Sequence, residues 1–459
     1  MRLYNSRSKK KEEFIPLHEG AVSMYHCGPT VYDYAHIGNF RAYILADLLR
    51  RLFEHAGFLV KQVMNITDVG HLASDADEGE DKMTMALKRE GRELTLENMK
   101  SLADFYAARF VEDLKRLNIK KPHEMPRASE HIPAQIALIK RLEERGLIYR
   151  TSDGLYFDTG AYPEYGAFGT VHQDDEEHSR IGANKEKKNH RDFALWKFSA
   201  ALGWESLWGK GFPGWHVECS AMSMEALGDS FDIHTGGIDL IGTHHTNEIA
   251  QSEAATGKPL ARFWLHNAFL SVDGEKMSKS KQNIFTLRDI AEKGANPLAY
   301  RYWLLTAQYR NPVNFTWDAL RAAEHALFKI YSQFFLFGET EGKPLPSYLA
   351  RFFTFVEDDL DTPRAVALVW KMLKDDTISD GDKKATLLEM DAVLGLSVVS
   401  LLSKKVPDAV LSLVEEREDA RKRKDWAKAD ALREQVKSHG FGLNDTNEGA
   451  VAFPLPQTL

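Results

Sequence analysis

Apolar positions near the start of the chain follow first a strand-like and then a helical pattern. Residues 21–27, AVSMYHC, form a short apolar run before a Gly-Pro pair, which is typical of a buried strand and a sharp turn. From His36 to Gly57 apolar residues recur at helical spacing, and residues 58–67, FLVKQVMNIT, resemble a second strand. This order predicts a parallel sheet with a nucleotide site at the strand ends.

The next part of the chain breaks this alternation. Residues 83–149 have a mostly helical pattern, and residues 151–208 are rich in turns, charges and aromatic side chains. Apolar segments return at 215–234 and 263–272, where we expect the sheet to resume. The intervening region is therefore predicted to be an insertion between the two halves of the sheet.

The last third of the chain has helical periodicity from about Asn296. Segments such as ALRAAEHALFKIYSQFFLF and RAVALVWKMLKDD are typical of an all-helical bundle, which residues 343–348, KPLPSY, interrupt once. Residues 440–453 are expected to form a small terminal hairpin. The predicted fold class is α/β, a Rossmann-like parallel-sheet domain with an insertion, followed by a helical bundle and a small C-terminal module.

Composition and charge set broad limits. With 459 residues, 43% hydrophobic and 27% charged, the chain is ordinary for a globular protein and long enough for two to four domains. No run approaches the roughly 20 apolar residues of a membrane span, and residues 1–11 lack the apolar core of a secretory signal, so we expect a cytoplasmic protein. The net charge of −8 leaves only local basic faces for nucleic acid.

The two cysteines, Cys27 and Cys219, are candidates for metal binding. A structural disulfide is disfavoured in such a chain, so the alternatives are inert buried thiols or ligands. His244 and Glu248 are spaced i, i+4 and share one helical face, where a surface ion pair is the alternative reading. Two thiolates, an imidazole and a carboxylate suit a tetrahedral zinc ion. His245 is an alternative ligand, although it points about 100° away on an ideal helix.

Two short motifs indicate nucleotide chemistry. His36-Ile37-Gly38-Asn39 places an imidazole and unpaired backbone N–H groups at a helix N-terminus, which stabilises a triphosphate. Gly38 leaves room for a base or ribose. Residues 276–280, KMSKS, supply ammonium groups that neutralise charge on a transferring nucleotide. The candidate catalytic residues are His36, Asn39, Lys276 and Lys279.

This pair of motifs resembles the HIGH and KMSKS signatures of the class I aminoacyl-tRNA synthetases. Asn39 replaces the second histidine; asparagine still donates hydrogen bonds but carries no charge. Within that class the chain is similar to the cysteinyl-tRNA synthetase family, through segments that run through most of the first 285 residues. These segments are YHCGPTVYDYAHIGN, MNITD, DFALWK, GWHVECSAM, FDIHTGGIDL, HHTNEIAQ and EKMSKS.

The resemblance implies roles for individual residues. It implies that Cys27, Cys219, His244 and Glu248 bind one zinc ion, which the substrate thiol joins. Further residues would contact ATP and the amino acid, although a turn glycine, a cap or a core aromatic is the alternative for each. The implied ATP-binding residues are Gly38, His234, Gly236, Gly237, Asp239 and Lys279, and the implied cysteine-binding residues are Thr67 and Trp215.

The C-terminal segment 417–433 carries a basic helix pair broken near Lys424. The resemblance places Arg421, Trp426, Asp430 and Asp445 at family anticodon contacts, where tryptophan stacks on bases and arginine adds charge. The alternative is a solvated amphipathic helix with Trp426 as a packing residue.

The resemblance also implies five domains. They are a catalytic domain (1–110 and 210–295), a connective insertion (111–209), a KMSKS and stem-contact region that overlaps the end of the catalytic domain (270–320), a helical bundle (321–403) and an anticodon-binding region (404–459).

The implied reaction is ATP-dependent attachment of L-cysteine to tRNA(Cys) through a cysteinyl-adenylate, with Mg²⁺ assisting and zinc selecting the thiol. The family also implies a monomer with no membrane partner. One alternative is a ligase that joins cysteine to a small amine, as in mycothiol-type pathways, which the helical region after residue 320 disfavours. The other is a zinc-stabilised tRNA-binding protein without activity, which the intact motifs disfavour.

Overall fold

The computed structural model describes most of the chain, and every structural statement below concerns these residues. Lys279 and nearly all of the acidic loop at 75–81 lie outside them. The described ranges are 1–70, 81–169, 185–200, 202–278, 281–402, 405–446 and 449–456. Within these ranges no helix is both long enough and apolar enough to span a bilayer.

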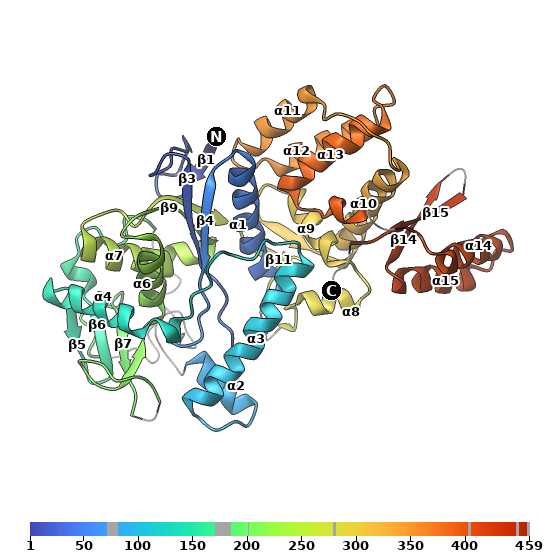
Figure 1. The fold of residues 1–459 in the computed structure, drawn as a ribbon. Coiled ribbons are helices and arrows are strands. Elements are labelled where there is room, and N and C mark those ends of the chain that lie inside the picture. The colour runs from blue at the N-terminus through green and yellow to red at the C-terminus, as the bar shows by residue number, and fades with distance from the viewer. Residues whose placement is uncertain are drawn as a thin grey trace.

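A parallel four-stranded sheet forms the centre of the molecule (Figure 1). Its strand order is β10-β9-β3-β4, with the bounds Ala261–Asn267, Phe231–Gly237, Ala21–His26 and Leu59–Met64. Strand β3 pairs in parallel with β4 on one side and with β9 on the other. The connection from β3 to β4 runs to one side and the connection from β9 to β10 runs to the other, so the strand order reverses between β3 and β9. Open α/β sheets bind their ligands at such a reversal.

Helix α1 (Ile37–His55) connects β3 to β4 and covers one face of the sheet (Figure 1). Its apolar residues, from Ile37 to Phe53, are almost all buried, so tertiary packing stabilises it along its whole length. The chain turns after it at Gly57, whose φ of 87° suits glycine. The strand-helix-strand unit predicted from the hydrophobic pattern is confirmed.

The prediction that the sheet resumes at 215–234 is only partly right. Residues Trp215–Leu227 form helix α6, and the strand begins later, at Phe231. Most of this helix is buried, including the polar residues His216, Glu218 and Ser220. A helix enclosed on all sides has no amphipathic stripe, so its sequence resembles a buried strand.

The predicted insertion is a second, antiparallel sheet. Its order is β5-β6-β7-β8, with bounds Ile148–Arg150, Gly154–Phe157, Phe193–Phe198 and Gly211–Pro213. Helices α2 (Lys82–Arg89), α3 (Leu96–Arg116) and α4 (Ile132–Glu144) precede it, as the helical pattern of 83–149 predicts. The sheet packs with α4 and α6 around a core that includes Trp196.

A small three-stranded sheet carries the second motif. Strands β11 (Leu270–Val272) and β13 (Val313–Phe315) are parallel, and β12 (Glu275–Lys276) returns antiparallel to β11. The turn between β11 and β12 uses Asp273 and Gly274, both at positive φ, as two-residue hairpins require. Lys276 therefore stands on a short hairpin rather than on a free loop.

Helices make up most of the remaining chain. They are α8 (Leu287–Glu292), α9 (Pro297–Leu305), α10 (Trp317–Leu336), α11 (Pro346–Val356), α12 (Thr362–Leu373) and α13 (Asp380–Leu394). At the other end of the chain, β1 (Arg2–Asn5) and β2 (Lys10–Glu13) form a hairpin beside β10. The helical prediction for the chain beyond Asn296 is confirmed except at β13, a strand of three residues.

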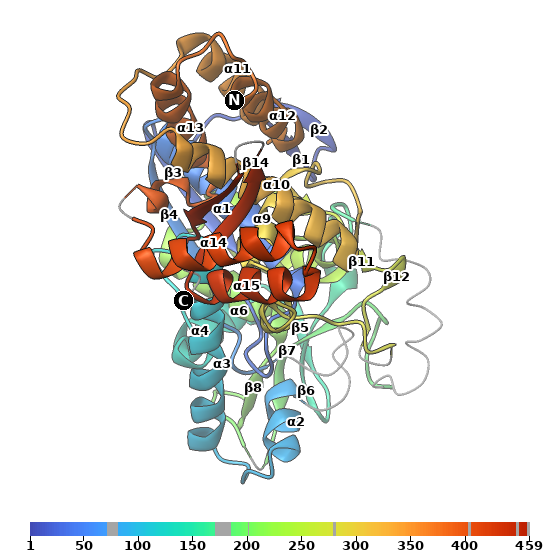
Figure 2. The ribbon, with the colours of Figure 1, turned by 90° about the vertical axis from the view of Figure 1, so that its right-hand side faces the viewer.

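The C-terminal module projects from the helical region (Figures 1 and 2). It consists of α14 (Asp408–Lys422), α15 (Trp426–Ser438) and the antiparallel pair β14 (Phe441–Thr446) and β15 (Gly449–Pro454). Its separate small core contains Val410, Val436 and Phe441. The predicted helix pair and terminal hairpin are both confirmed.

Candidate active site and metal centre

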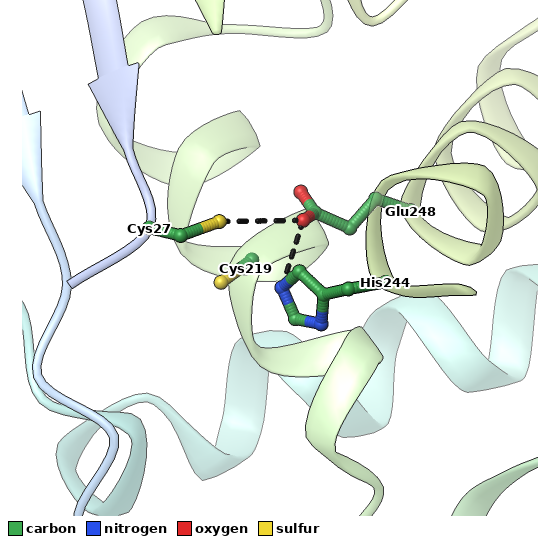
Figure 3. Close-up of side chains that lie close together, drawn as sticks. All are labelled: Cys27, Cys219, His244 and Glu248. Carbon is green, nitrogen blue, oxygen red and sulfur yellow. Dashed lines mark hydrogen bonds and ion pairs between the residues drawn. The ribbon is translucent and has the colours of Figure 1, made fainter. Parts of the chain in front are cut away.

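Four side chains that the sequence singled out converge at the sheet edge (Figure 3). Cys27 follows β3, Cys219 lies in α6, and Glu248 lies in the first turn of α7 (Thr246–Thr256). His244 comes from a π-helical turn, Ile241–His245, directly before α7. One ligand atom from each residue lies within 4.8 Å of the others, so segments over 200 residues apart in sequence form one cluster.

The contacts inside this cluster fit a metal site. Glu248 Oε1 lies 2.9 Å from His244 Nε2 and 3.7 Å from Cys27 Sγ. Although it is buried and close to that carboxylate, His244 Nε2 makes no hydrogen bond of acceptable geometry in the described structure. A buried nitrogen aimed at a common point with two thiols and a carboxylate is what a zinc ligand requires.

Electrostatics within the cluster favour charged ligands. Burial raises the pKa of Cys219, but the Cys27 thiol and His244 lower it to about 6. Burial likewise opposes ionisation of Glu248, and His234 and His244 nevertheless lower its pKa to about 2. For Cys27, burial raises the pKa well above its ordinary value. The cluster therefore favours ionisation of Cys219 and Glu248, whereas burial opposes ionisation of Cys27, whose proton a bound metal ion would displace.

His245 differs from its predicted position. Its Nε2 lies 3.2 Å from Cys27 Sγ, and its Nδ1 lies 2.7 Å from His266 Nε2. A second overlapping group of candidate ligands is therefore Cys27, His234, His245 and Glu248. The expectation that His245 points away is wrong, because His245 lies three residues before Glu248 and His244 lies four before it, so both share the helical face of that carboxylate.

Of the two predicted cysteine-binding residues, Trp215 borders the cluster, and Thr67 bonds Glu218, the residue before Cys219. The ring of Trp215 lies 4.3 Å from that of His244, centroid to centroid. Thr67 Oγ1 accepts a hydrogen bond from Asn65 and donates one to Glu218 Oε2, each at 3.0 Å. Sequence reasoning missed Asn65 and Glu218 as individual residues, although both lie within the matched segments MNITD and GWHVECSAM.

The first motif forms the N-terminal cap of α1. His36 is the N-cap residue, and its Nδ1 accepts a hydrogen bond from Asn39 N at 3.3 Å. Asn39 Oδ1 in turn accepts from His36 N at 3.0 Å, which completes a capping box. The imidazole and the open end of the helix therefore lie together, as the motif predicts.

Side chains of the protein occupy the space beside the three predicted nucleotide-binding glycines. A Cβ on Gly38 would collide with the Met277 methyl group, and one on Gly236 would lie 2.8 Å from His245 Cε1. At Gly237 the close neighbour is the carboxylate of Asp239, an exposed residue in the turn Ile238–Leu240. The roles of these glycines and of Asp239 toward ATP remain predictions.

His234 lies closer to the metal cluster than the nucleotide prediction implies. Its Nε2 is 2.9 Å from Glu248 Oε2, and its ring stacks on Trp264 with centroids 4.4 Å apart. Its Nδ1 is buried without a hydrogen-bond partner in the described structure. His234 thus faces the cluster directly, and its contact with the adenylate remains a prediction.

The hairpin that carries Lys276 lies close to the first motif. Lys276 pairs with Ser271 across the hairpin, and its carbonyl accepts a hydrogen bond from Asn283 Nδ2 at 3.2 Å. Asn283 Oδ1 also accepts from Ser278 N at 2.8 Å. His36 forms an isolated bridge with Thr286, just beyond this segment. The two motifs therefore meet, although Lys279 itself falls outside the described residues.

The predicted anticodon residues lie on the C-terminal module. Asp445 binds three arginines, which are Arg417, Arg421 and Arg433, at distances from 2.8 to 3.1 Å. These contacts lower the pKa of Asp445 despite its partial burial. Trp426 is 59% exposed, so it is not the packing residue of the alternative reading, and Asp430 is also exposed.

Comparison with known families identifies two regions of the chain. Residues 13–325 match the model of the class I (C) tRNA synthetase catalytic domain, and residues 403–449 match the cysteinyl-tRNA ligase anticodon-binding domain. The chain also has the fold of Mycobacterium tuberculosis methionyl-tRNA synthetase, with a TM-score of 0.58 at 16% identity, covering 84% of this chain and 94% of that one. That likeness concerns the fold alone.

Full-length relatives are more closely similar in sequence. Cysteine–tRNA ligase 1 of Burkholderia lata is 44% identical over 99% of this chain and 97% of its own length. Cysteine–tRNA ligase of Treponema denticola is 40% identical over 97% of this chain and 98% of its own. With the catalytic fold, the paired motifs and the cluster of metal-ligand residues in place, the chain belongs to the cysteinyl-tRNA synthetase family of class I aminoacyl-tRNA synthetases.

Proposed function

We propose that this chain is a cysteine–tRNA ligase that activates L-cysteine with ATP and transfers it to tRNA(Cys). The observation that carries the proposal is the convergence of Cys27, Cys219, His244 and Glu248 beside the carboxyl end of β3. The HIGN helix cap and the Lys276 hairpin meet at the same edge. Thiol recognition and nucleotide chemistry would thus occur side by side.

The metal cluster is proposed to select the substrate thiol. Its four residues would hold one zinc ion, which supplies a soft Lewis-acid centre that prefers a thiolate to a hydroxyl group. Trp215 and the buried Thr67 hydroxyl would bound the pocket beside it. The His244 ring, tilted by 35° against Trp215, and the hydrogen bond from Thr67 to Glu218 would hold these two walls in place.

The chain's nucleotide-binding groups are proposed to act by positioning and by charge. A carboxylate oxygen of cysteine attacks the α-phosphorus of ATP, and pyrophosphate leaves with the electron pair of the broken bond. His36, Asn39 and the N-terminus of α1 would bind the phosphates, and Lys276 and Lys279 would stabilise the developing charge. His234, Gly236, Gly237 and Asp239 would adjoin the adenylate, and Mg²⁺ would accompany ATP.

The second step is proposed to use the C-terminal module. The cysteinyl group passes from the adenylate to the 2′-hydroxyl of the terminal adenosine, and AMP leaves. Trp426 would stack on an anticodon base, while Arg421, Asp430 and Asp445 would contact base edges and phosphates. A ligase that joins cysteine to a small amine does not need this module, so its presence favours tRNA as the acceptor. The predicted domain limits, cytoplasmic location and monomeric state remain predictions.

Three measurements on the purified protein test the proposal. We expect cysteine-dependent exchange of pyrophosphate into ATP, little exchange with serine, and charging of tRNA(Cys). Metal analysis should find about one zinc per wild-type chain and a large loss of zinc in Cys219→Ser. Equal exchange with serine, or transfer to small amines without charging of tRNA, would refute the assignment.

A further inference from the structure

Arg41 is a buried cation on α1, two residues after the HIGN motif. Its side chain is 4% exposed. In the described structure its guanidinium donates four hydrogen bonds, and all four acceptors are backbone carbonyl oxygens. Nη1 bonds Ala268 at 2.8 Å and Phe269 at 2.7 Å, and Nη2 bonds Tyr309 at 3.0 Å and Asn311 at 2.5 Å.

These carbonyls lie where two strands of the small sheet begin. Ala268 and Phe269 lead into β11, and Tyr309 and Asn311 lead into β13. The two segments also bond each other, from Ala268 N to Tyr309 O at 3.0 Å and from Val313 N to Phe269 O at 3.2 Å. Arg41 therefore holds together the segments that precede β11 and β13, and β11 is the first strand of the hairpin whose second strand carries Lys276.

A second link joins the first motif to the far end of the same segment. Ile37 N donates to Phe285 O at 2.8 Å, and the Tyr300 hydroxyl donates to Ile37 O at 2.6 Å. Phe285 lies two residues after Asn283, which braces the Lys276 carbonyl. The start of α1 thus holds the KMSKS segment on both sides, through Arg41 before the hairpin and through Ile37 after it.

We propose that Arg41 is a positioning residue for adenylate formation, which fixes the Lys276 hairpin relative to the His36 cap. The proposal rests on the function proposed above. Groups from the two motifs must act on one triphosphate, and a misplacement of about 1 Å can cost roughly a hundredfold in rate. Arginine suits this task because its planar fork presents five donors, whereas the single ammonium of lysine cannot span two segments.

A double-mutant cycle with Lys276 tests this role. If Arg41 acts through the hairpin, its loss matters only while Lys276 is present to be positioned. We expect Arg41→Lys to lower kcat for cysteine-dependent pyrophosphate exchange by about a hundredfold in the wild-type background. In the Lys276→Ala background the same change should cost less than about threefold, because coupled residues are not additive. The KM for cysteine should stay within about twofold, since the thiol pocket lies on other elements.

Arg51 provides a matched control on the same helix. It is also buried, and it bonds Asp47 and the carbonyls of Asn118 and Ala392, away from the hairpin. Arg51→Lys is expected to have the same effect with and without Lys276. If Arg41→Lys instead lowers kcat by the same factor with and without Lys276, the proposal is overturned.

Thermal unfolding of each variant separates folding from positioning. Arg41→Gln is the second variant, since it keeps a donor with a smaller side chain. If neither variant folds, Arg41 is a structural residue and the proposal is wrong. Failure of the proposed function itself would appear differently, as wild-type protein without cysteine-dependent exchange.

Discussion

Asn39 and His36 bind each other at the start of α1. Asn39 Oδ1 accepts from His36 N at 3.0 Å, and Asn39 N donates to His36 Nδ1 at 3.3 Å. Because Nδ1 is an acceptor, the neutral imidazole carries its proton on Nε2. The backbone N–H of Asn39 thus orients the His36 ring, and the asparagine side chain holds the His36 backbone instead.

Substitution of Asn39 should separate capping from charge. Asn39→Ala removes the side-chain half of the capping box, and we expect a loss of about 1 kcal/mol in unfolding free energy with reduced exchange activity. Asn39→Asp keeps the acceptor oxygen, so stability should be retained, but its charge should raise the KM for ATP. Urea unfolding and pyrophosphate exchange measure the two effects. Equal stability of Asn39→Ala and wild type would show that the box does not stabilise the helix.

Metal removal should affect thiol recognition more than the fold. The ligands lie on α6, α7 and the end of β3, which pack into large apolar cores without the metal. We expect a strong chelator to abolish cysteine binding, measured by calorimetry, and to lower the unfolding temperature only moderately. Added zinc should restore binding and added magnesium should not. Unchanged cysteine affinity after verified metal removal would contradict the thiol-selection role.

Asp47 should make stability depend on acidic pH. Asp47 and Arg301 are both fully buried and bond each other at 2.6 Å, and Arg51 bonds the same carboxylate at 2.7 Å. Burial alone would raise the pKa of Asp47, but the two arginines lower it below its ordinary value of 3.8. A depressed folded pKa gives stability that is present above 3.8 and is lost as pH falls through the folded value.

Asp47→Asn tests this expectation. At pH 7 the variant leaves two buried guanidinium groups without their anion, so we expect a loss of about 3–5 kcal/mol in unfolding free energy. The difference from wild type should shrink as pH falls below about 4, because the unfolded wild-type chain then binds a proton. Denaturant unfolding at several pH values measures it. A difference that stays constant with pH would exclude the ionised carboxylate as its source.

Trp426 should act in the tRNA step. Its exposed indole at the start of α15 is available to stack on an unpaired base, a contact worth roughly 1–3 kcal/mol. Trp426→Ala is therefore expected to lower kcat/KM for tRNA charging by about tenfold to a hundredfold. Pyrophosphate exchange needs no tRNA and should stay unchanged, which would place the defect in the tRNA step. Normal charging of tRNA by the variant would show that Trp426 does not contribute to tRNA binding.

The sequence predicted those features that have a local cause. The β3-α1-β4 unit, the helix pair and the terminal hairpin follow from periodicity and turn residues. Burial on nearly all sides gives helix α6 a sequence that resembles a strand, and the i, i+3 spacing of His245 to Glu248 places this second imidazole in the pocket. No spacing rule could bring Cys27 next to Glu248. That convergence was expected from the family resemblance alone, because it is made by the order of strands in the sheet.

The π-helical turn at Ile241–His245 has a consequence for which changes in length the chain tolerates. Loss of a single residue there would convert it to ordinary helix and rotate the preceding backbone by about 100° relative to α7. His244 and His245 end this turn, so loss of a residue before them keeps their spacing of four and three residues from Glu248. Chain length at this bend therefore sets the direction in which β9 and the turn that holds Asp239 approach α7, rather than which imidazole faces the carboxylate.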